Sequence, residues 1–222
     1  MGRGLFITGT DTDVGKTYVT ALLVKTLRSA GYDVGYYKAA ISGARTVEES
    51  DAGFVNRFAQ ICEPEDMLLS YLYQNAVSPH LAARIEGNPV EKDVIMGAWE
   101  RVTAAYPYVT MEGSGGIMCP IRHDEKAVHY LEDIIRWLRL PVLVIADAGL
   151  GTINRVVTTC EYIRRRNISV KGIILNHWKG GVMEEDNVEM IEEITGMKVL
   201  ARVKKGDTAL DIDPETIISL YE

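Results

Sequence analysis

The sequence has few cysteines and no excess of basic residues, and each shortage excludes a class of protein. Its three cysteines, Cys62, Cys119 and Cys160, are odd in number and widely spaced, so they predict neither a disulfide framework nor a paired-cysteine metal site. We expect ordinary, partly buried thiols. The formal net charge is −7, whereas nucleic-acid binding depends on clustered Lys and Arg that neutralise phosphates. We therefore expect no nucleic-acid partner.

A long hydrophobic run is also lacking. No stretch reaches the ~20 apolar residues that span a bilayer, and Met1 precedes the apolar segment Leu5–Thr8 too closely for a signal peptide. We therefore expect a cytoplasmic protein without a membrane partner. The 222 residues are 47% hydrophobic and 25% charged, which is typical of a globular protein. This length predicts a single domain over residues 1–222.

Short apolar runs alternate with amphipathic segments along the chain. This pattern predicts an α/β fold in which helices flank a mostly parallel central sheet. The run Pro141–Ala146 is apolar without alternation, as expected for a strand that is covered on both faces. The predicted strands are Gly4–Thr8, Val34–Lys38, Tyr108–Glu112, Val142–Ala146, Val170–Asn176 and Val199–Val203.

Apolar residues at helical spacing fill most of the intervals between these strands. Val19, Leu22, Leu23 and Leu27 follow this spacing before Gly31, which we expect to end the helix. Further helices are predicted over Asp51–Gln60, Pro79–Glu86, Glu91–Ala105, His129–Leu138, Arg155–Arg166, Glu184–Ile194 and Pro214–Tyr221.

A glycine-rich loop joins the first predicted strand to the first helix and reads Gly9-Thr-Asp-Thr-Asp-Val-Gly15-Lys16-Thr17. Such a loop aims backbone N–H groups and a helix N-terminus at bound phosphates. Lys16 would neutralise the outer phosphates, and the Thr17 hydroxyl would join a Mg²⁺ shell. Five residues separate Gly9 from Gly15 instead of the consensus four. The strand–loop–helix context still predicts phosphate binding and a P-loop NTPase-like domain.

Loops of this lengthened form resemble those of the dethiobiotin synthetase family, and further matches occur in the family's order. The matching segments are Lys38–Gly43, Ser50–Ala52, Ser78–Ala83, Glu112–Gly116 and Leu150–Asn154. The family carboxylates 7,8-diaminopelargonate with CO₂ and uses ATP to close the cyclic urea of dethiobiotin, releasing ADP and phosphate. The resemblance, which extends from Gly4 to about Asn176, implies this reaction, ATP as co-substrate, Mg²⁺ and a homodimer.

The resemblance also assigns roles to the matching residues. It implies Lys38 and Lys16 as catalytic residues, and Thr17, Asp51 and Glu112 as metal ligands. The substrate-binding residues that it implies are Thr12, Ser42, Gly151, Thr152, Ile153 and Asn154, the last four at a helix start that holds the substrate's tail carboxylate across the dimer interface. The nucleotide-binding residues that it implies are Asp13, Val14, Gly15, Lys16, Thr17, Tyr18, Asp51, Glu112, Gly113, Ser114, Gly115 and Asn176.

Several of these residues also have purely structural interpretations. Lys38 ends a predicted strand, where ligands gather in an open α/β sheet, but a strand-end lysine can equally extend its ammonium into solvent. Ser42 can cap a turn, Asp51 can cap a helix and Asn176 can end a strand. Glu112 ends an apolar strand before a glycine-rich turn, whose N–H groups would be open to a ligand.

The sequence departs from the family at two places. Ala39-Ala40 replaces a common Pro-Val pair, and Lys204–Gly206 stands where a proline-containing loop near the base is usual. The second departure leaves the nucleotide preference open.

Two other functions fit parts of the sequence. The main alternative is a deviant P-loop ATPase switch of the partitioning or metal-cluster delivery type, but the early lysine of such loops is missing. The amidotransferase synthetases of cobalamin assembly need a further glutaminase domain, for which we expect no room in 222 residues.

Overall fold

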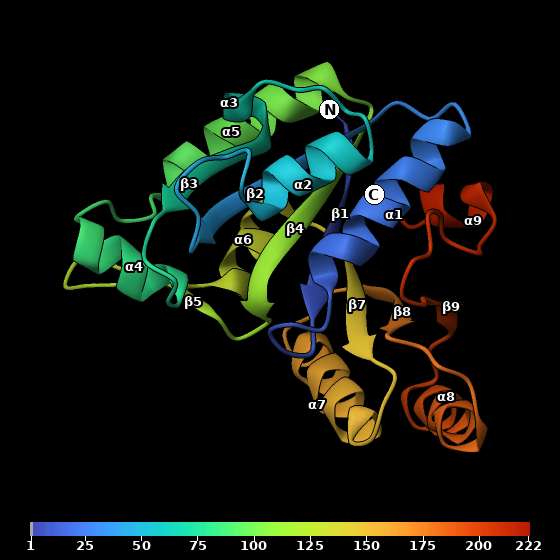
Figure 1. Cartoon of the computed structure of the whole chain (residues 1–222). Helices are drawn as coiled ribbons and strands as arrows, with labels where there is room; N and C mark the ends of the chain where they lie inside the picture. Colours follow the sequence, from blue (N-terminus) through green and yellow to red (C-terminus); the bar gives the residue numbers. More distant parts are fainter. Residues whose placement is uncertain (1) are drawn as a thin grey trace.

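A parallel β-sheet forms the centre of the protein in the computed structural model, which describes residues 2–222 (Figure 1). Within these residues the main sheet has seven strands in the order β3-β2-β4-β1-β7-β8-β9, and neighbouring strands are parallel. The strands are β1 (Arg3–Gly9), β2 (Val34–Ser42), β3 (Leu69–Tyr73), β4 (Tyr108–Gly116), β7 (Val142–Asp147), β8 (Val170–Asn176) and β9 (Val199–Arg202). The predicted fold class is confirmed.

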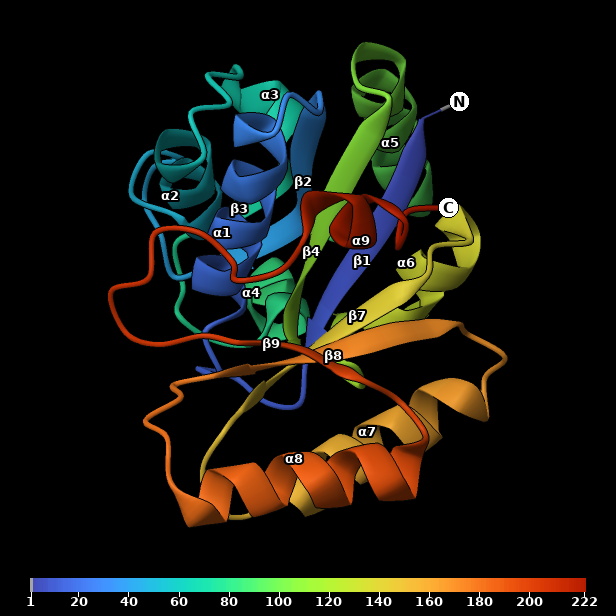
Figure 2. The same ribbon diagram turned by 90° about the vertical axis from the view of Figure 1, so that its right-hand side faces the viewer.

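Helices cover both faces of this sheet (Figure 2). Chain connections between parallel strands are right-handed. Helices in connections that move across the sheet toward β3 therefore lie on one face, and helices in connections that move toward β9 lie on the other. The first set is α1 (Lys16–Ser29), α2 (Asp51–Phe58) and the short α3 (Glu65–Leu68). The second set is α4 (Pro79–Glu86), α5 (Lys92–Ala105), α6 (Leu131–Leu138), α7 (Thr152–Arg164) and α8 (Val182–Thr195), and α9 (Pro214–Ile218) packs on α1.

Several observed elements differ from those predicted from the sequence. Strand β3 was missed although its burial alternates. His129 and Tyr130, predicted to start a helix, form β6 (Val128–Tyr130), which pairs antiparallel with β5 (Pro120–His123). The last helix ends at Ile218 rather than at the predicted Tyr221. The predicted helix Pro79–Glu86 matches α4 at both ends. The remaining predicted helices begin or end within a few residues of the observed bounds, where helix ends fray.

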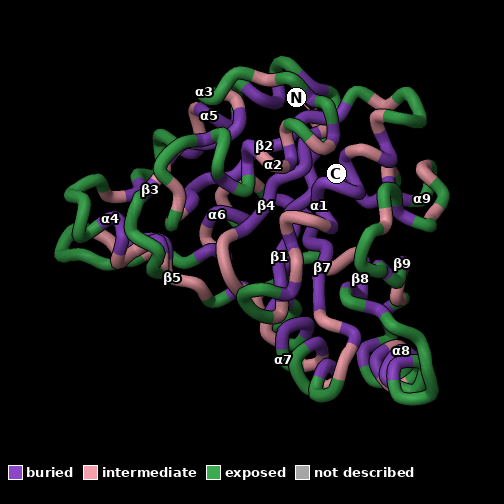
Figure 3. The backbone as a smooth tube through the Cα atoms, viewed as in Figure 1, coloured by how far each residue is buried: buried purple, intermediate pink, exposed green. Residues whose placement is uncertain are grey.

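The central strands carry the core. Strands β1 and β7 are buried along most of their length (Figure 3), and for β7 this was predicted from its unbroken apolar run. All three cysteines are free: Cys119 is partly buried as predicted, whereas Cys160 is fully buried and Cys62 is exposed. No helix among the described residues is long and apolar enough to cross a membrane.

The order of the strands brings the predicted site together. Strand β4 lies between β1 and β2, so their carboxyl ends, which are distant in sequence, meet at one edge of the sheet. The register pairs Lys38 with Glu112. Strand β2 does not end at Lys38 as predicted but runs on to Ser42 beside β3, and its pairing with β4 stops at Lys38. The two strands therefore separate beyond this pair and leave a crevice, as expected at the carboxyl edge of such a sheet.

Gly53, in the first turn of α2, marks a close approach of two backbones that sets the position of Asp51. A Cβ at Gly53 would lie 2.3 Å from the carbonyl oxygen of Val47 and 2.5 Å from that of Glu48. Because both neighbours are backbone atoms, only a shift of the helix start could relieve the contact.

We expect Gly53→Ala to lower the free energy of unfolding by ~1–3 kcal/mol, the usual range for overpacking. The matched control is Gly97→Ala inside α5, where no atom lies within 4 Å of an added Cβ. This change should raise stability by up to ~1 kcal/mol, because alanine is the better helix former. Urea unfolding measures both effects, and equal stability of Gly53→Ala and the unaltered protein would contradict the close approach.

Candidate active site

The loop between β1 and α1 has the backbone shape that a phosphate cradle needs. Gly15, the N-cap of α1, has φ 81°, and a Cβ there would lie 2.1 Å from Nδ2 of Asn176, so only glycine fits. Lys16 is 7% exposed, and its Nζ donates to the carbonyl oxygen of Asp11 at 2.9 Å. Burial lowers the pKa of Lys16, and the nearby Lys38 ammonium lowers it further.

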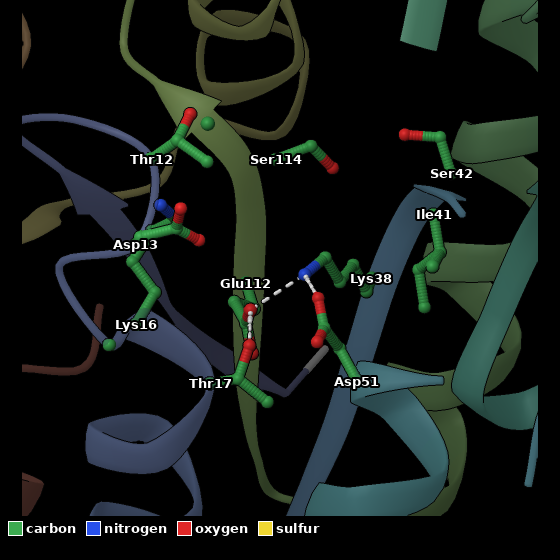
Figure 4. Close-up of a pocket in the computed structure, with 12 residues that line it drawn as sticks. Thr12, Asp13, Lys16, Thr17, Lys38, Ile41, Ser42, Asp51, Glu112 and Ser114 are labelled. Carbon is green, nitrogen blue, oxygen red and sulfur yellow. Dashed lines mark hydrogen bonds and ion pairs between the residues drawn. The ribbon is translucent and has the colours of Figure 1, made fainter. Parts of the chain in front are cut away.

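A lysine between two carboxylates lies next to this loop (Figure 4). Nζ of Lys38 is 2.6 Å from Oδ2 of Asp51 and 2.7 Å from Oε1 of Glu112. Thr17, in the first turn of α1, donates its hydroxyl to the same Oε1 at 2.7 Å. Four separate elements, β2, α2, β4 and α1, therefore supply one cluster of charged and polar groups.

Lys38 and Glu112 are buried, whereas the side chain of Asp51 is 48% exposed, and the opposite charges stabilise one another. Lys38 is 3% exposed; burial alone would lower its pKa, but Glu112 and Asp51 outweigh that effect and leave the pKa raised. Burial would raise the pKa of Asp51, but the charge and hydrogen bond of Lys38 bring that pKa below its ordinary value. The ammonium and the Asp51 carboxylate are therefore both charged at neutral pH.

Tyr36 completes the cluster and was missed in the sequence. Its hydroxyl donates to Oε2 of Glu112 at 3.1 Å. Burial, followed by the charge of Glu112, raises the pKa of Tyr36 well above its ordinary value, so the hydroxyl keeps its proton. Side chains two residues apart in a strand share a face, and this rule could have placed Tyr36 beside Lys38 once the strand pairing was known.

More than half of the predicted site residues line one cavity of about 320 Å³. It lies in the crevice between β2 and β4 and extends to the phosphate loop, and its size is typical of a small-molecule site. Ile41 lines it without having been predicted. The predicted residues in its lining are Thr12, Asp13, Gly15, Lys16, Thr17, Lys38, Ser42, Asp51, Glu112, Ser114 and Gly115.

Other predicted residues lie outside the lining of this cavity. Val14 is buried, Tyr18 donates its hydroxyl to the carbonyl oxygen of Asp207, and Asn176 donates from Nδ2 to the carbonyl oxygen of Val14 at 3.0 Å. The amide of Asn176 therefore supports the phosphate loop with one N–H, and Oδ1 has no partner of its own among the hydrogen bonds of the described residues.

The glycine-rich segment after Glu112 is not the predicted turn, because β4 continues through Gly116. A Cβ at Gly113 would lie 2.8 Å from Cδ2 of Leu131 and 2.9 Å from Cε1 of Phe6. Packing therefore accounts for glycine at this position. Ser114 and Gly115 do reach the cavity, and Ser114 donates its hydroxyl to the carbonyl oxygen of Ala40 at 2.6 Å.

The segment Gly151–Asn154 forms the start of α7, and none of it lines the cavity. Gly151 is its N-cap with φ 86°. The hydroxyl of Thr152 is buried and has no hydrogen-bond partner within residues 2–222. The preceding Leu150 is 84% exposed, so this helix start lies at an uncovered surface.

The oxygen atoms of the cluster suit a hard divalent cation. Thr17, Asp51 and Glu112 offer a hydroxyl and two carboxylates, and the Lys38 ammonium between the carboxylates shows that they converge on a positive charge. The described residues contain no group of three or more His, Cys, Asp or Glu side chains that could hold a metal. Such a sparse set suits Mg²⁺, which takes one or two carboxylates and completes its octahedron with water and phosphate oxygens.

Comparison with solved structures identifies the fold. The chain resembles a ParA family ATPase from Chlorobium tepidum, with a TM-score of 0.58 and 12% identity over 99% of this chain and 90% of that one. A putative plasmid partition protein from Borrelia burgdorferi gives a TM-score of 0.59 and 11% identity over 99% and 98% of the two chains. At these identities the likeness shows the P-loop fold alone and does not favour the switch hypothesis.

Comparison of sequences identifies the family. The family described as "AAA domain" matches residues 3–209. The ATP-dependent dethiobiotin synthetase of Brachyspira hyodysenteriae is 48% identical over 100% of both chains. That of Clostridium kluyveri is 41% identical over 98% of this chain and 92% of its own length. The chain, with its phosphate loop and buried lysine–carboxylate cluster, therefore belongs to the ATP-dependent dethiobiotin synthetase family.

Proposed function

We propose that this protein is a cytoplasmic enzyme that uses ATP to close a cyclic urea on 7,8-diaminopelargonate, yielding dethiobiotin, ADP and phosphate. One observation carries the proposal: a phosphate loop and a cluster of a buried lysine with two carboxylates line the same cavity. A phosphate loop alone would fit any nucleotide hydrolase. The ammonium of Lys38 beside it supplies a place for a second anionic reactant.

The reaction joins three substrates in sequence. One amine attacks the carbon of CO₂ and loses a proton, which gives a carbamate. A carbamate oxygen then attacks the γ-phosphorus of ATP and displaces ADP, leaving a carbamic–phosphoric anhydride. The second amine attacks the carbonyl carbon, loses a proton and displaces phosphate, which closes the ring. Holding the reactants in place accounts for much of the catalysis, because effective molarities of ~10⁵ M or above are reached in well-oriented reactions.

Charge stabilisation accounts for the rest. The Lys38 ammonium would face the carbamate, and one such pair at 4 Å is stabilised by about 4 kcal/mol before desolvation costs. Lys16 would neutralise the outer phosphates as charge develops on them. Ser42 and Thr12, on the cavity wall, would contact the diamine, and Oδ1 of Asn176 would contact the adenine.

Magnesium is part of the proposal. Thr17, Asp51 and Glu112 would hold Mg²⁺, which when bound neutralises phosphate charge. The support is the convergence of these oxygens beside the phosphate loop, described above. The contacts with Lys38 and between Thr17 and Glu112 hold these oxygen atoms in place, so that the nucleotide would meet a preformed set of ligands.

We also propose that the enzyme is a homodimer in which the start of α7 from one copy serves the cavity of the other. The segment Gly151–Asn154 does not line the cavity of its own chain. The buried hydroxyl of Thr152, which has no hydrogen-bond partner within residues 2–222, and the helix N-terminus would suit a carboxylate. The exposed Leu150 side chain offers apolar area for a contact between copies.

Turnover with Mg²⁺, ATP and bicarbonate should depend on 7,8-diaminopelargonate and give a product heavier than the diamine by CO₂ minus water. Lys38→Met should lower kcat by ~10²-fold or more, because the ammonium acts on the transition state. Lys126→Met, which removes an exposed lysine, is the control. Mass spectrometry and ADP release measure both, and ATP hydrolysis indifferent to the diamine would refute the proposed reaction.

Asn154→Asp should raise KM for the diamine ~10-fold while kcat stays within about twofold. The change is nearly isosteric, and a carboxylate in the first turn favours the helix, so the fold is retained while the substrate's tail carboxylate is repelled. Steady-state kinetics with and without high salt measures the effect, because salt screens charge repulsion. An unchanged KM would remove the start of α7 from the substrate site.

Mixing Lys38→Met with Asn154→Asp should restore activity at limiting diamine. In a mixed dimer one of the two cavities combines an intact Lys38 with an intact Asn154 of the other copy, so a random mixture should recover about a quarter of the unaltered activity. Refolding the two variants together and assaying against each alone provides the measurement. No recovery in a proven dimer would mean that each copy completes its own site.

A further inference from the structure

Glu112 is bonded at both carboxylate oxygens, and the two oxygens have different surroundings. Oε1 lies with Thr17 and Lys38, each at 2.7 Å, beside the cavity. Oε2 accepts a hydrogen bond from the hydroxyl of Tyr36 at 3.1 Å. Tyr36 and Glu112 are each 1% exposed, so bulk water has no access to replace that hydroxyl.

Strand geometry explains why the hydroxyl of Tyr36 reaches Oε2 of Glu112, the oxygen that does not contact Lys38. Tyr36 and Lys38 lie two residues apart on β2 and therefore share a face of the sheet. The register pairs Lys38 with Glu112 on β4. Tyr36 thus lies two residues further along β2 from the cavity than Lys38. Tyr36 contacts Oε2 of Glu112, and Lys38 contacts Oε1.

We propose that Tyr36 is a positioning residue that presents Oε1 of Glu112, and only that oxygen, to Mg²⁺. The inference rests on the magnesium site proposed above. A carboxylate free to rotate can offer either oxygen or both, whereas Mg²⁺ requires near-ideal octahedral geometry. Hydrogen bonds to the far side of a ligand orient it, and losing them commonly weakens metal binding by 10–100-fold.

The neighbouring tyrosine provides a matched comparison. Tyr37 lies on the opposite face of β2, is fully buried and shares a hydrogen bond of 2.6 Å with Oγ of Ser70. Its ring packs near Trp99 of α5, away from the cavity. Tyr36→Phe and Tyr37→Phe each delete one buried hydroxyl from the same strand, but only the first deletion touches Glu112.

The test measures binding of ADP to the full-length protein by calorimetry, first in a metal chelator and then across a Mg²⁺ titration. For Tyr36→Phe we expect the Mg²⁺ concentration at half-maximal enhancement of ADP binding to rise about 10-fold or more. For Tyr37→Phe it should stay within about twofold. Metal-free binding of ADP should be the same in both variants and the unaltered protein, because the phosphate loop is unchanged.

Each other outcome overturns the inference in a distinguishable way. An unchanged Mg²⁺ midpoint for Tyr36→Phe, or an equal rise for Tyr37→Phe, would assign the hydroxyl a packing role only. Loss of metal-free ADP binding in Tyr36→Phe would mean that the hydroxyl supports the whole site. If ADP binding to the unaltered protein ignored Mg²⁺, the proposed metal site itself would be wrong.

Discussion

The active-site region depends on one interaction, the contact of the buried Lys38 ammonium with the carboxylates of Asp51 and Glu112. The two carboxylates carry like charges that repel each other at short range, and the ammonium between them offsets that repulsion. Burying the ammonium is unfavourable by itself and is offset by these two partners. The cluster therefore connects β2, α2 and β4, the elements that supply the three charged side chains.

The cavity has two walls of different composition. One wall is the phosphate loop, whose shape depends on glycine at position 15 and on the amide of Asn176 behind it. The other wall is the charged cluster. The separation of β2 from β4 beyond Lys38 and Glu112 creates the space between the walls. A nucleotide and an anionic reactant can thus lie side by side, each facing a lysine.

Burial also restricts what each group in the cluster can do. Lys38 and Glu112 are almost inaccessible to solvent, so their orientation is set by neighbouring protein atoms and not by water. Preorganised charges of this kind need no rearrangement as a reaction proceeds. The helix start at Gly151–Asn154 differs because it lies at an exposed surface, which is consistent with a role between two copies of the chain.

The sequence by itself determined the α/β class and the phosphate loop, because these follow from local patterns: apolar runs, helical spacing and a glycine-rich loop before Lys16. Most of the cavity lining was predicted from the resemblance of the sequence to a known family. Only the tertiary structure decided which strands are neighbours, and with them the pairing of Lys38 with Glu112. It likewise extended β2 and β4 beyond their predicted ends and placed Tyr36 behind Glu112. The physical reason is that hydrogen bonds between strands join residues distant in sequence, and no local pattern records such a partner.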